Sequence, residues 1–228
     1  RLQRVLEESQ IRSLSIISSV TGVDCYLGPG MWGEGTHPAV ERELGSFLYA
    51  TGDLKAEEIC VKLLTDTGTT LATAESVTGG LLASRIVCVP GASRVFLEGF
   101  ITYSNKAKIE RLGVSKEFLE SRGAVSEEIC VQMAEGARER TGSDLAMSTT
   151  GIAGPGGATE AKPVGYCFIG LATAGGSYCV NVLLGGGREA VRGRAASIAI
   201  DLLRLELQGH SDRLDPLRVE GNDGRPGS

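Results

Sequence analysis

The sequence contains very few histidines. Its only two, His37 and His210, both lie outside the most coherent stretch of the chain, residues 54–208. A catalytic triad or dyad built on histidine needs that residue beside its nucleophile, so such a site is excluded within the stretch. A histidine-ligated zinc site is excluded for the same reason, and we expect no bound metal. No G-x-x-x-x-G-K-[ST] motif occurs, which argues against a nucleoside triphosphatase.

Long apolar runs are also missing. None approaches the ~20 residues that a membrane helix needs, and the polar segment RLQRVLEESQ lacks the apolar core of a signal peptide. We therefore expect a cytoplasmic protein that does not bind a membrane. The formal net charge of -5 argues against an extended nucleic-acid surface. The six cysteines form no C-x-x-C pair, and we expect them to be reduced and mostly buried.

The length of 228 residues, with 42% hydrophobic and 22% charged residues, suits one medium domain with extra segments. Residues 1–53 are rich in turns, and we interpret them as a linker or the remnant of a preceding domain. Residues 54–208 form the expected domain, and residues 209–228 are polar and expected to be disordered. The glycines cluster at the ends of apolar runs, which is typical of an α/β fold.

Apolar periodicity within residues 54–208 predicts five helices and five strands. The predicted helices are Leu54–Asp66, Gly79–Val87, Lys106–Leu112, Glu127–Arg140 and an amphipathic Arg188–Leu207. The predicted strands are Thr69–Ala74, Val95–Tyr103, Leu145–Thr150, Val164–Ala174 and Tyr178–Leu184. Ser126 is placed to be the N-cap of the fourth helix. This order predicts a three-layer α/β/α sandwich around a mixed β-sheet.

The first candidate motif is E-S-V-T-G-G, which follows a strand and opens a helix. Ser76 is therefore expected at the end of the sheet, where it can act as a nucleophile. Backbone N–H groups of Thr78, Gly79 and Gly80 lie beside a helix N-terminus and can stabilise an oxyanion. The alternative is a tight turn in which the hydroxyl groups merely cap the helix.

The second motif is T-Y-S-N-K-A-K, again between a strand and a helix. A serine without histidine needs another base, and a desolvated lysine can serve. Burial lowers the pKa of a lysine and makes the neutral amine available, and the motif offers Lys106 and Lys108 for this role. Tyr103 can relay the proton or hold the lysine, and Asn105 can bind substrate or hold the lysine. The alternative is a solvated helical turn with two surface lysines.

Two further motifs predict a phosphate site. G-I-A-G-P-G-G follows a strand, and such a loop lets the backbone approach a ligand closely. G-G-G-R-E-A-V-R opens the last helix with two arginines. Positive charges at the N-terminus of a helix oppose the helix dipole, so an anion such as a phosphate is expected nearby. A long connection between strands is the alternative for the first loop. The residues expected to contact ligand are Gly151, Gly154, Gly156, Lys162, Arg188 and Arg192.

Together, AESVTGGLLASRI, GFITYSNKAKIERLGV, GAVSEE, TTGIAGPGGATEAKPVG and GGGREAVRGRA resemble the CinA C-terminal domain and the stand-alone nicotinamide-nucleotide amidases. The resemblance spans about residues 54–207. It implies hydrolysis of nicotinamide mononucleotide to nicotinate mononucleotide and ammonia, a step of pyridine nucleotide salvage. It also implies catalysis by Ser76, Tyr103 and Lys108 in a three-layer fold, with no required metal or cofactor. Val77 departs from the family, in which many members have cysteine.

Two other readings compete. Short-chain dehydrogenases also use Ser, Tyr and Lys, but they place Tyr and Lys four residues apart, whereas Lys106 and Lys108 lie three and five residues after Tyr103. A non-catalytic nucleotide-binding or regulatory module that keeps the fold is the second reading. The expected partner is a small nucleotide substrate and no nucleic acid. We also expect a homo-oligomer, either a dimer or a larger assembly.

Overall fold

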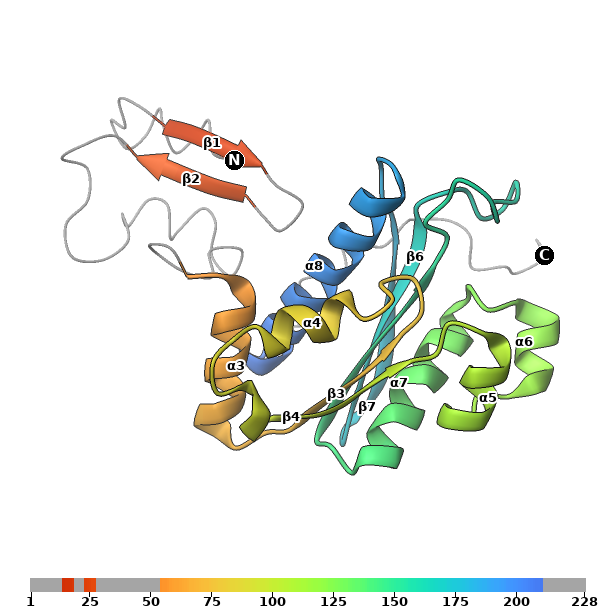
Figure 1. The fold of residues 1–228 in the computed structure, drawn as a ribbon, viewed down its shortest axis with the longest axis horizontal. Helices are drawn as coiled ribbons and strands as arrows, with labels where there is room; N and C mark the ends of the chain where they lie inside the picture. The colour runs from red at the N-terminus through yellow and green to blue at the C-terminus, as the bar shows by residue number, and fades with distance from the viewer. Residues whose placement is uncertain (1–13, 19–22, 28–53, 211–228) are drawn as a thin grey trace.

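The computed structural model describes residues 14–18, 23–27 and 54–210 (Figure 1). β1 (Leu14–Ser18) and β2 (Val23–Leu27) pair antiparallel in a two-stranded sheet of their own. No strand was predicted in this part of the chain. The remainder of residues 1–53 and the tail from residue 211 lie outside the described residues, so the interpretation of both segments stays a prediction.

The domain is built on a five-stranded sheet with the strand order β4-β3-β5-β6-β7. Its strands are β3 (Leu71–Glu75), β4 (Phe96–Ile101), β5 (Leu145–Gly151), β6 (Tyr166–Thr173) and β7 (Gly176–Leu183). The first three run parallel, whereas β6 is antiparallel to both of its neighbours. The predicted mixed sheet is therefore confirmed.

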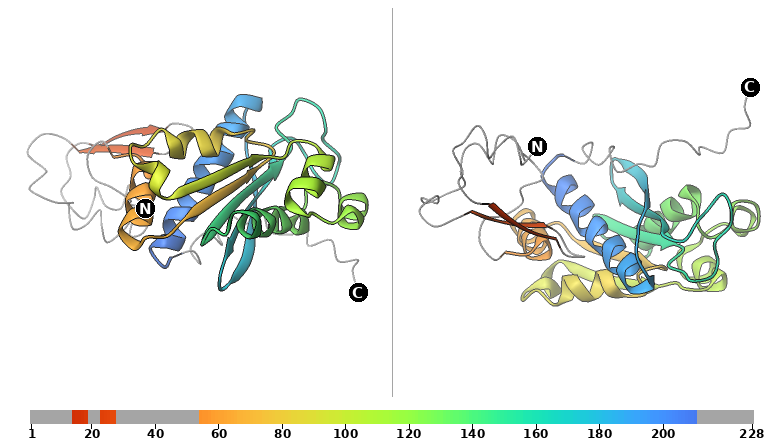
Figure 2. Two further views of the ribbon diagram at one scale, coloured as in Figure 1. Left: turned by 60° about the horizontal axis from the view of Figure 1, so that its bottom comes forward. Right: turned by 90° about the horizontal axis from the view of Figure 1, so that it is seen from above.

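Helices cover both faces of this sheet (Figures 1 and 2). One face carries α3 (Ala56–Thr67), α4 (Leu81–Val87) and α8 (Arg188–Leu207), and the larger apolar core lies beneath them. The other face carries α5 (Asn105–Leu112), α6 (Lys116–Arg122) and α7 (Glu127–Thr141) over a smaller core. A short 3-10 helix, Ala92–Arg94, precedes β4. This arrangement confirms the three-layer α/β/α sandwich.

A close approach of α5 to α7 fixes the position of α5. A Cβ atom on Gly136 of α7 would lie 2.0 Å from the carbonyl oxygen of Leu112, so only glycine allows this contact. Leu112 is buried, as is Lys108 one turn earlier on the same helix. The packing of α7 therefore holds α5 with one face, including Lys108, turned into the protein.

Several details differ from the sequence predictions. α6 was not predicted, and the helix expected from Gly79 begins only at Leu81 because Gly79 and Gly80 adopt positive φ angles of 61° and 94°. Ser126 is the N-cap residue of α7, as predicted, but its hydroxyl donates to the Gly123 carbonyl at 3.1 Å and accepts no hydrogen bond from the helix. α8 is buried on most sides of its second half and is not simply amphipathic. No helix in residues 54–210 is long and apolar enough to span a membrane.

Candidate active site

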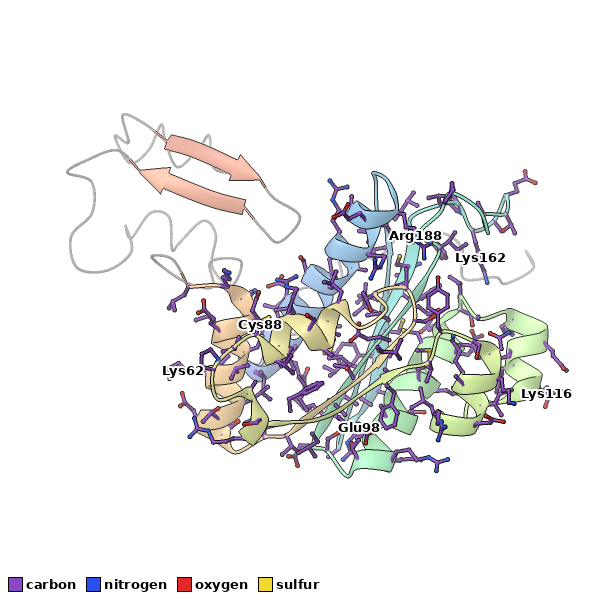
Figure 3. The ribbon with its side chains drawn as sticks, viewed as in Figure 1. Lys62, Cys88, Glu98, Lys116, Lys162 and Arg188 are labelled. Atoms are coloured by element: carbon purple, nitrogen blue, oxygen red, sulfur yellow. The ribbon has the colours of Figure 1, made fainter. Side chains whose placement is uncertain are left out.

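The four candidate motifs converge on one edge of the sheet. β3, β4 and β5 run parallel, so the segments after Glu75, Ile101 and Gly151 emerge at the same edge. β7 runs parallel to β5 and leads through a glycine turn into α8. Figure 3 shows Arg188 and Lys162 at this end of the sheet. Ligands of open α/β sheets bind at such an edge.

Ser76 and Lys108 are in direct contact. Lys108 Nζ lies 3.2 Å from Ser76 Oγ and donates to the carbonyl oxygen of Thr102 at 2.8 Å. Ser76 is half-buried and anchored by its own N–H, which donates to the carbonyl of Thr149 on β5 at 2.9 Å. A nucleophile and a base within hydrogen-bond reach, with the base oriented by a third group, is the arrangement that nucleophilic catalysis needs.

Burial changes the acidity of Lys108. Only 1% of the residue is exposed, and desolvation lowers the pKa of its amine from 10.5 to about 8. Removing an ammonium group from water disfavours the charged form, so a useful fraction of Lys108 is neutral near physiological pH. Lys106 is the opposite case, since its side chain is 80% exposed and pairs with Glu110 at 3.7 Å.

Glu75, which sequence reasoning left without a role, organises the loop after β3. Its carboxylate accepts the Thr78 hydroxyl at 2.6 Å and the backbone N–H groups of Gly80, Leu82 and Ala83 at 2.8, 3.0 and 2.8 Å. The N–H of Gly80, one of the expected oxyanion donors, therefore has a protein partner. The sequence signal for this role is an acidic residue at the end of an apolar strand just before a helix, because its carboxylate can accept the N–H groups at the start of that helix.

Tyr103 is not part of the Ser76–Lys108 contact. Tyr103 is 61% exposed, and its hydroxyl accepts a hydrogen bond from Arg188 at 2.9 Å. Arg188 also donates to the carbonyl of Gly154 at 3.0 Å. The structure thus joins three segments through Arg188. The role predicted for Tyr103 in catalysis stays a prediction.

Arg192, one turn further along α8, holds the nucleophile loop. Its guanidinium donates to the carbonyl oxygen of Thr78 at 2.8 and 3.3 Å. A Cβ atom on Gly79 would lie 3.5 Å from this guanidinium. Within residues 54–210, neither Arg188 nor Arg192 forms a salt bridge with a carboxylate. Two cationic groups held by neutral acceptors suit an anionic ligand.

The glycine-rich loop after β5 is shaped for close packing at Gly154. That residue has a φ angle of 78°, and a Cβ atom on it would lie 2.7 Å from Val164 Cγ1. Gly151 is packed against Cys167, whereas Gly156 is exposed with open space around it. Lys162 donates to the carbonyls of Arg122 and Val125 at 3.0 and 2.6 Å, so its ammonium group ties the loop to the segment before α7.

The remaining candidates are peripheral. Asn105 is exposed at the start of α5 and forms no hydrogen bond through its side chain within the described residues. The expectation for the cysteines is confirmed for Cys60, Cys130, Cys167 and Cys179, which are buried thiols, whereas Cys88 is exposed. In the described parts of the chain, no three His, Cys, Asp or Glu side chains could hold a metal ion together. A metal-free reaction stays a prediction.

Known proteins similar to this chain belong to one family. Residues 53–207 match the family model described as the CinA C-terminal domain. A CinA-like protein of Kosmotoga olearia is 50% identical over 168 residues, which cover 74% of this chain and 41% of that protein. A CinA-like protein of Chloroherpeton thalassium is 48% identical, with 73% and 40% covered. The chain thus spans about two fifths of the length of these curated relatives.

Solved structures include proteins of nearly the same extent as the domain. The competence/damage inducible protein CihA from Agrobacterium tumefaciens is 36% identical with a TM-score of 0.64, covering 70% of this chain and 99% of its own. A CinA superfamily protein from Escherichia coli is 31% identical with a TM-score of 0.63, covering 71% and 98%.

Proposed function

Since the chain belongs to the CinA C-terminal domain family, we propose that it is an amidohydrolase that uses Ser76 as nucleophile and Lys108 as base. The observation that carries the proposal is the contact of 3.2 Å between Ser76 Oγ and a lysine amine that is 1% exposed. A surface lysine with an ordinary pKa would be almost fully protonated at neutral pH and could not accept a proton.

The geometry allows each step to be written in full. The neutral amine of Lys108 donates to the Thr102 carbonyl and presents its lone pair to the Ser76 hydroxyl. Ser76 Oγ attacks the amide carbon of the substrate while its proton passes to Lys108. The tetrahedral intermediate then breaks its C–N bond, and Lys108 returns the proton to the leaving nitrogen, which departs as ammonia. Water then attacks the resulting ester while Lys108 accepts its proton, and Lys108 passes that proton to Ser76 Oγ as the C–O bond breaks, which releases the acid and restores both residues.

Nicotinamide mononucleotide is the substrate that we propose. It carries a primary amide, which releases ammonia, and a phosphate, which suits the guanidinium groups of Arg188 and Arg192. Both arginines bind neutral oxygen atoms at the edge where Ser76 lies, so their charge is available to an anion. The product is nicotinate mononucleotide. The contact of Tyr103 with Arg188 supports a role for Tyr103 in binding the same substrate.

The test is ammonia release from the purified chain with nicotinamide mononucleotide and a panel of other primary amides. The wild-type protein should release ammonia and nicotinate mononucleotide in equal amounts. Ser76→Ala should fold normally and lose turnover by roughly three or more orders of magnitude, because a covalent nucleophile is removed. Near-normal turnover of Ser76→Ala would contradict the mechanism. Binding of the nucleotide without any ammonia release would favour a non-catalytic nucleotide-binding module.

A further inference from the structure

Glu75 carries a buried negative charge that no cation neutralises within the described residues. It is 1% exposed, and all four groups that donate to its carboxylate belong to the segment that follows it. A buried carboxylate is stable only when hydrogen bonds replace its water. The segment Ser76–Ala83 therefore folds around the Glu75 side chain, and Ser76 is the first residue of that segment.

This arrangement determines which backbone donors face no protein acceptor. The N–H groups of Gly80, Leu82 and Ala83 are occupied by Glu75. In residues 54–210, the N–H groups of Val77, Thr78 and Gly79 donate to no protein atom. The donors left for a substrate oxygen are thus those immediately after the nucleophile, and Glu75 holds the turn in which they lie.

The main chain of Glu75 performs a separate task. Its carbonyl oxygen accepts the N–H of Thr102 at 2.9 Å, and the carbonyl of Thr102 accepts the Lys108 amine at 2.8 Å. These contacts belong to the sheet and to the base, and they do not involve the Glu75 side chain. A substitution of the Glu75 side chain should therefore change the position of the nucleophile loop and leave the position and the pKa of Lys108 unchanged.

We propose that the Glu75 side chain is a positioning residue that holds Ser76 and the following N–H groups in the geometry of attack. The proposal rests on the proposed function only in taking Ser76 as the nucleophile. Glu75 touches neither substrate nor base. Its effect should appear in the rate of reaction at Ser76, because a misplacement of about 1 Å at a reacting group can cost about 100-fold in rate.

The variant that tests this is Glu75→Gln. Glutamine has the same shape, but one of its two terminal atoms is an NH2 group, which faces N–H donors and cannot accept from them. We expect kcat to fall about 100-fold while KM changes less than about threefold. The pH at half-maximal rate should stay near 8, since Lys108 keeps its contacts.

Glu57→Gln is the matched control. Glu57 is also a buried glutamate, 9% exposed, and its carboxylate accepts two hydrogen bonds from Arg85, which is not among the groups that donate to Glu75. It should lower the melting temperature while leaving kcat unchanged. If Glu75→Gln does not fold, Thr78→Val removes one donor to Glu75 and should lower kcat, with Thr149→Val as its control because it breaks only the Thr78–Thr149 contact.

A second measurement keeps this proposal distinct from the proposed function. The rate of Ser76 phosphonylation by a fluorophosphonate probe, followed by intact-protein mass, reports the nucleophile without any amide. If the wild-type protein hydrolyses no amide yet labels at Ser76, the amidase proposal fails, and slower labelling of Glu75→Gln still supports the role of Glu75.

Three results would overturn the role of Glu75. The first is labelling and turnover of Glu75→Gln at the wild-type rate, with only the melting temperature lowered, as in Glu57→Gln. The second is a loss of rate that is accompanied by a shift of the pH midpoint, which would place the effect on Lys108. The third is a wild-type protein whose Ser76 is not labelled at all, since Glu75 would then position no nucleophile.

Discussion

At the scale of single residues, activity should depend on pH through Lys108. Only the neutral amine accepts a proton, and its fraction rises as the pH increases through the lowered pKa of about 8. We expect kcat/KM to rise about tenfold per pH unit below that value and to level off above it. Lys108→Arg should be inactive because arginine stays protonated. Kinetics between pH 6 and 10 measure both effects.

Lys106→Ala is the internal control for that experiment. Its side chain is 80% exposed and pairs with Glu110 on the same helix, so its removal should leave the pH profile unchanged. Robust turnover by Lys108→Arg, or an inactive Lys106→Ala beside an active Lys108→Ala, would reassign the base.

Arg188 and Lys162, two of the three basic residues predicted to bind phosphate, should affect KM differently when they are replaced. Arg188→Ala should raise KM for the mononucleotide by about tenfold or more, the loss expected for a charge-assisted hydrogen bond, and should affect the dephosphorylated riboside less. Lys162→Ala is the matched comparison, because its ammonium group is bound to the carbonyls of Arg122 and Val125. It should change the KM values of both substrates equally. Steady-state kinetics with both substrates decide between the two roles.

The sequence could predict the Ser76–Lys108 pair but not the surroundings of either residue. Both stand at strand-to-helix transitions, and parallel strands bring such transitions together. The Tyr103–Arg188 contact joins residues 85 positions apart, and its existence depends on where α8 begins relative to β4. Burial of Lys108 likewise depends on α7, because no local pattern distinguishes it from exposed Lys106.

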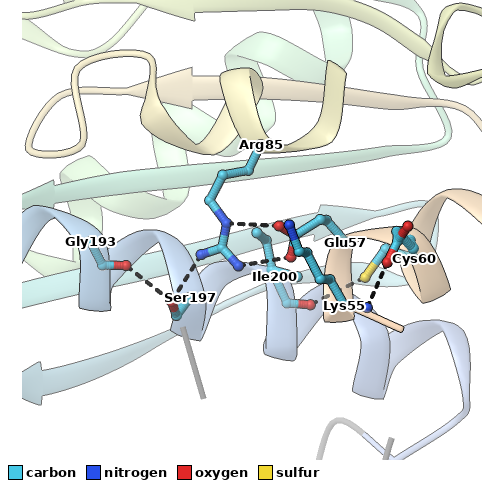
Figure 4. Close-up of polar contacts among 8 residues, drawn as sticks. Lys55, Glu57, Cys60, Arg85, Gly193, Ser197 and Ile200 are labelled. Carbon is cyan, nitrogen blue, oxygen red and sulfur yellow. Dashed lines mark hydrogen bonds and ion pairs between the residues drawn. The ribbon is translucent and has the colours of Figure 1, made fainter. Parts of the chain in front are cut away.

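At the scale of elements, one polar contact links α3, α4 and α8 (Figure 4). Arg85 of α4 donates to both oxygens of Glu57 at 2.8 and 3.4 Å and to Ser197 Oγ at 2.8 Å. Burial raises the pKa of the Glu57 carboxyl, but the hydrogen bonds and charge of Arg85 outweigh it, so the net shift is downward. The contact holds α4 against the helix that carries Arg188 and Arg192.

Arg85→Ala should therefore destabilise the fold. It leaves a buried carboxylate without its cation, and breaking such a pair costs about 2–4 kcal/mol when burial is incomplete. We expect a lower melting temperature at neutral pH and a smaller difference from the wild type in acid, since the lowered pKa of Glu57 stabilises the wild-type fold above the unfolded pKa and that contribution is lost as pH falls. Arg140→Ala, on the exposed part of α7, should change stability by less than about 0.5 kcal/mol. Equal melting temperatures for the two variants would show that the contact contributes nothing.

The helices and strands were predictable to the extent that apolar periodicity marks them. α8 begins and ends where the pattern placed it, at Arg188 and Leu207, whereas α6 was missed because K-E-F-L-E-S-R has only two large apolar residues. Ser126 has the sequence of an N-cap, yet its hydroxyl turns to Gly123. Which of two available acceptors or donors a side chain uses depends on the tertiary fold, so local rules cannot settle it.

At the scale of the whole molecule, the chain should contain one independently folding unit within residues 53–210. The match to the Agrobacterium structure covers 99% of that protein and 70% of this chain. A protein that consists of little more than the matched region therefore forms this fold. Among the described residues, the buried side chains of the apolar core beneath α3, α4 and α8 belong to residues 56–205.

Truncation to residues 53–210 should therefore preserve both cooperative unfolding and the kcat of the full chain. Starting instead at residue 62 removes the buried Cys60 and Val61 from the core and deletes Glu57, the partner of Arg85. We expect that shorter chain to be unfolded, because losing several buried side chains and one buried ion pair exceeds the stability of an ordinary domain. Circular dichroism during heating and ammonia release measure both outcomes. Loss of folding or turnover in the 53–210 chain would show that the preceding residues are part of the working domain.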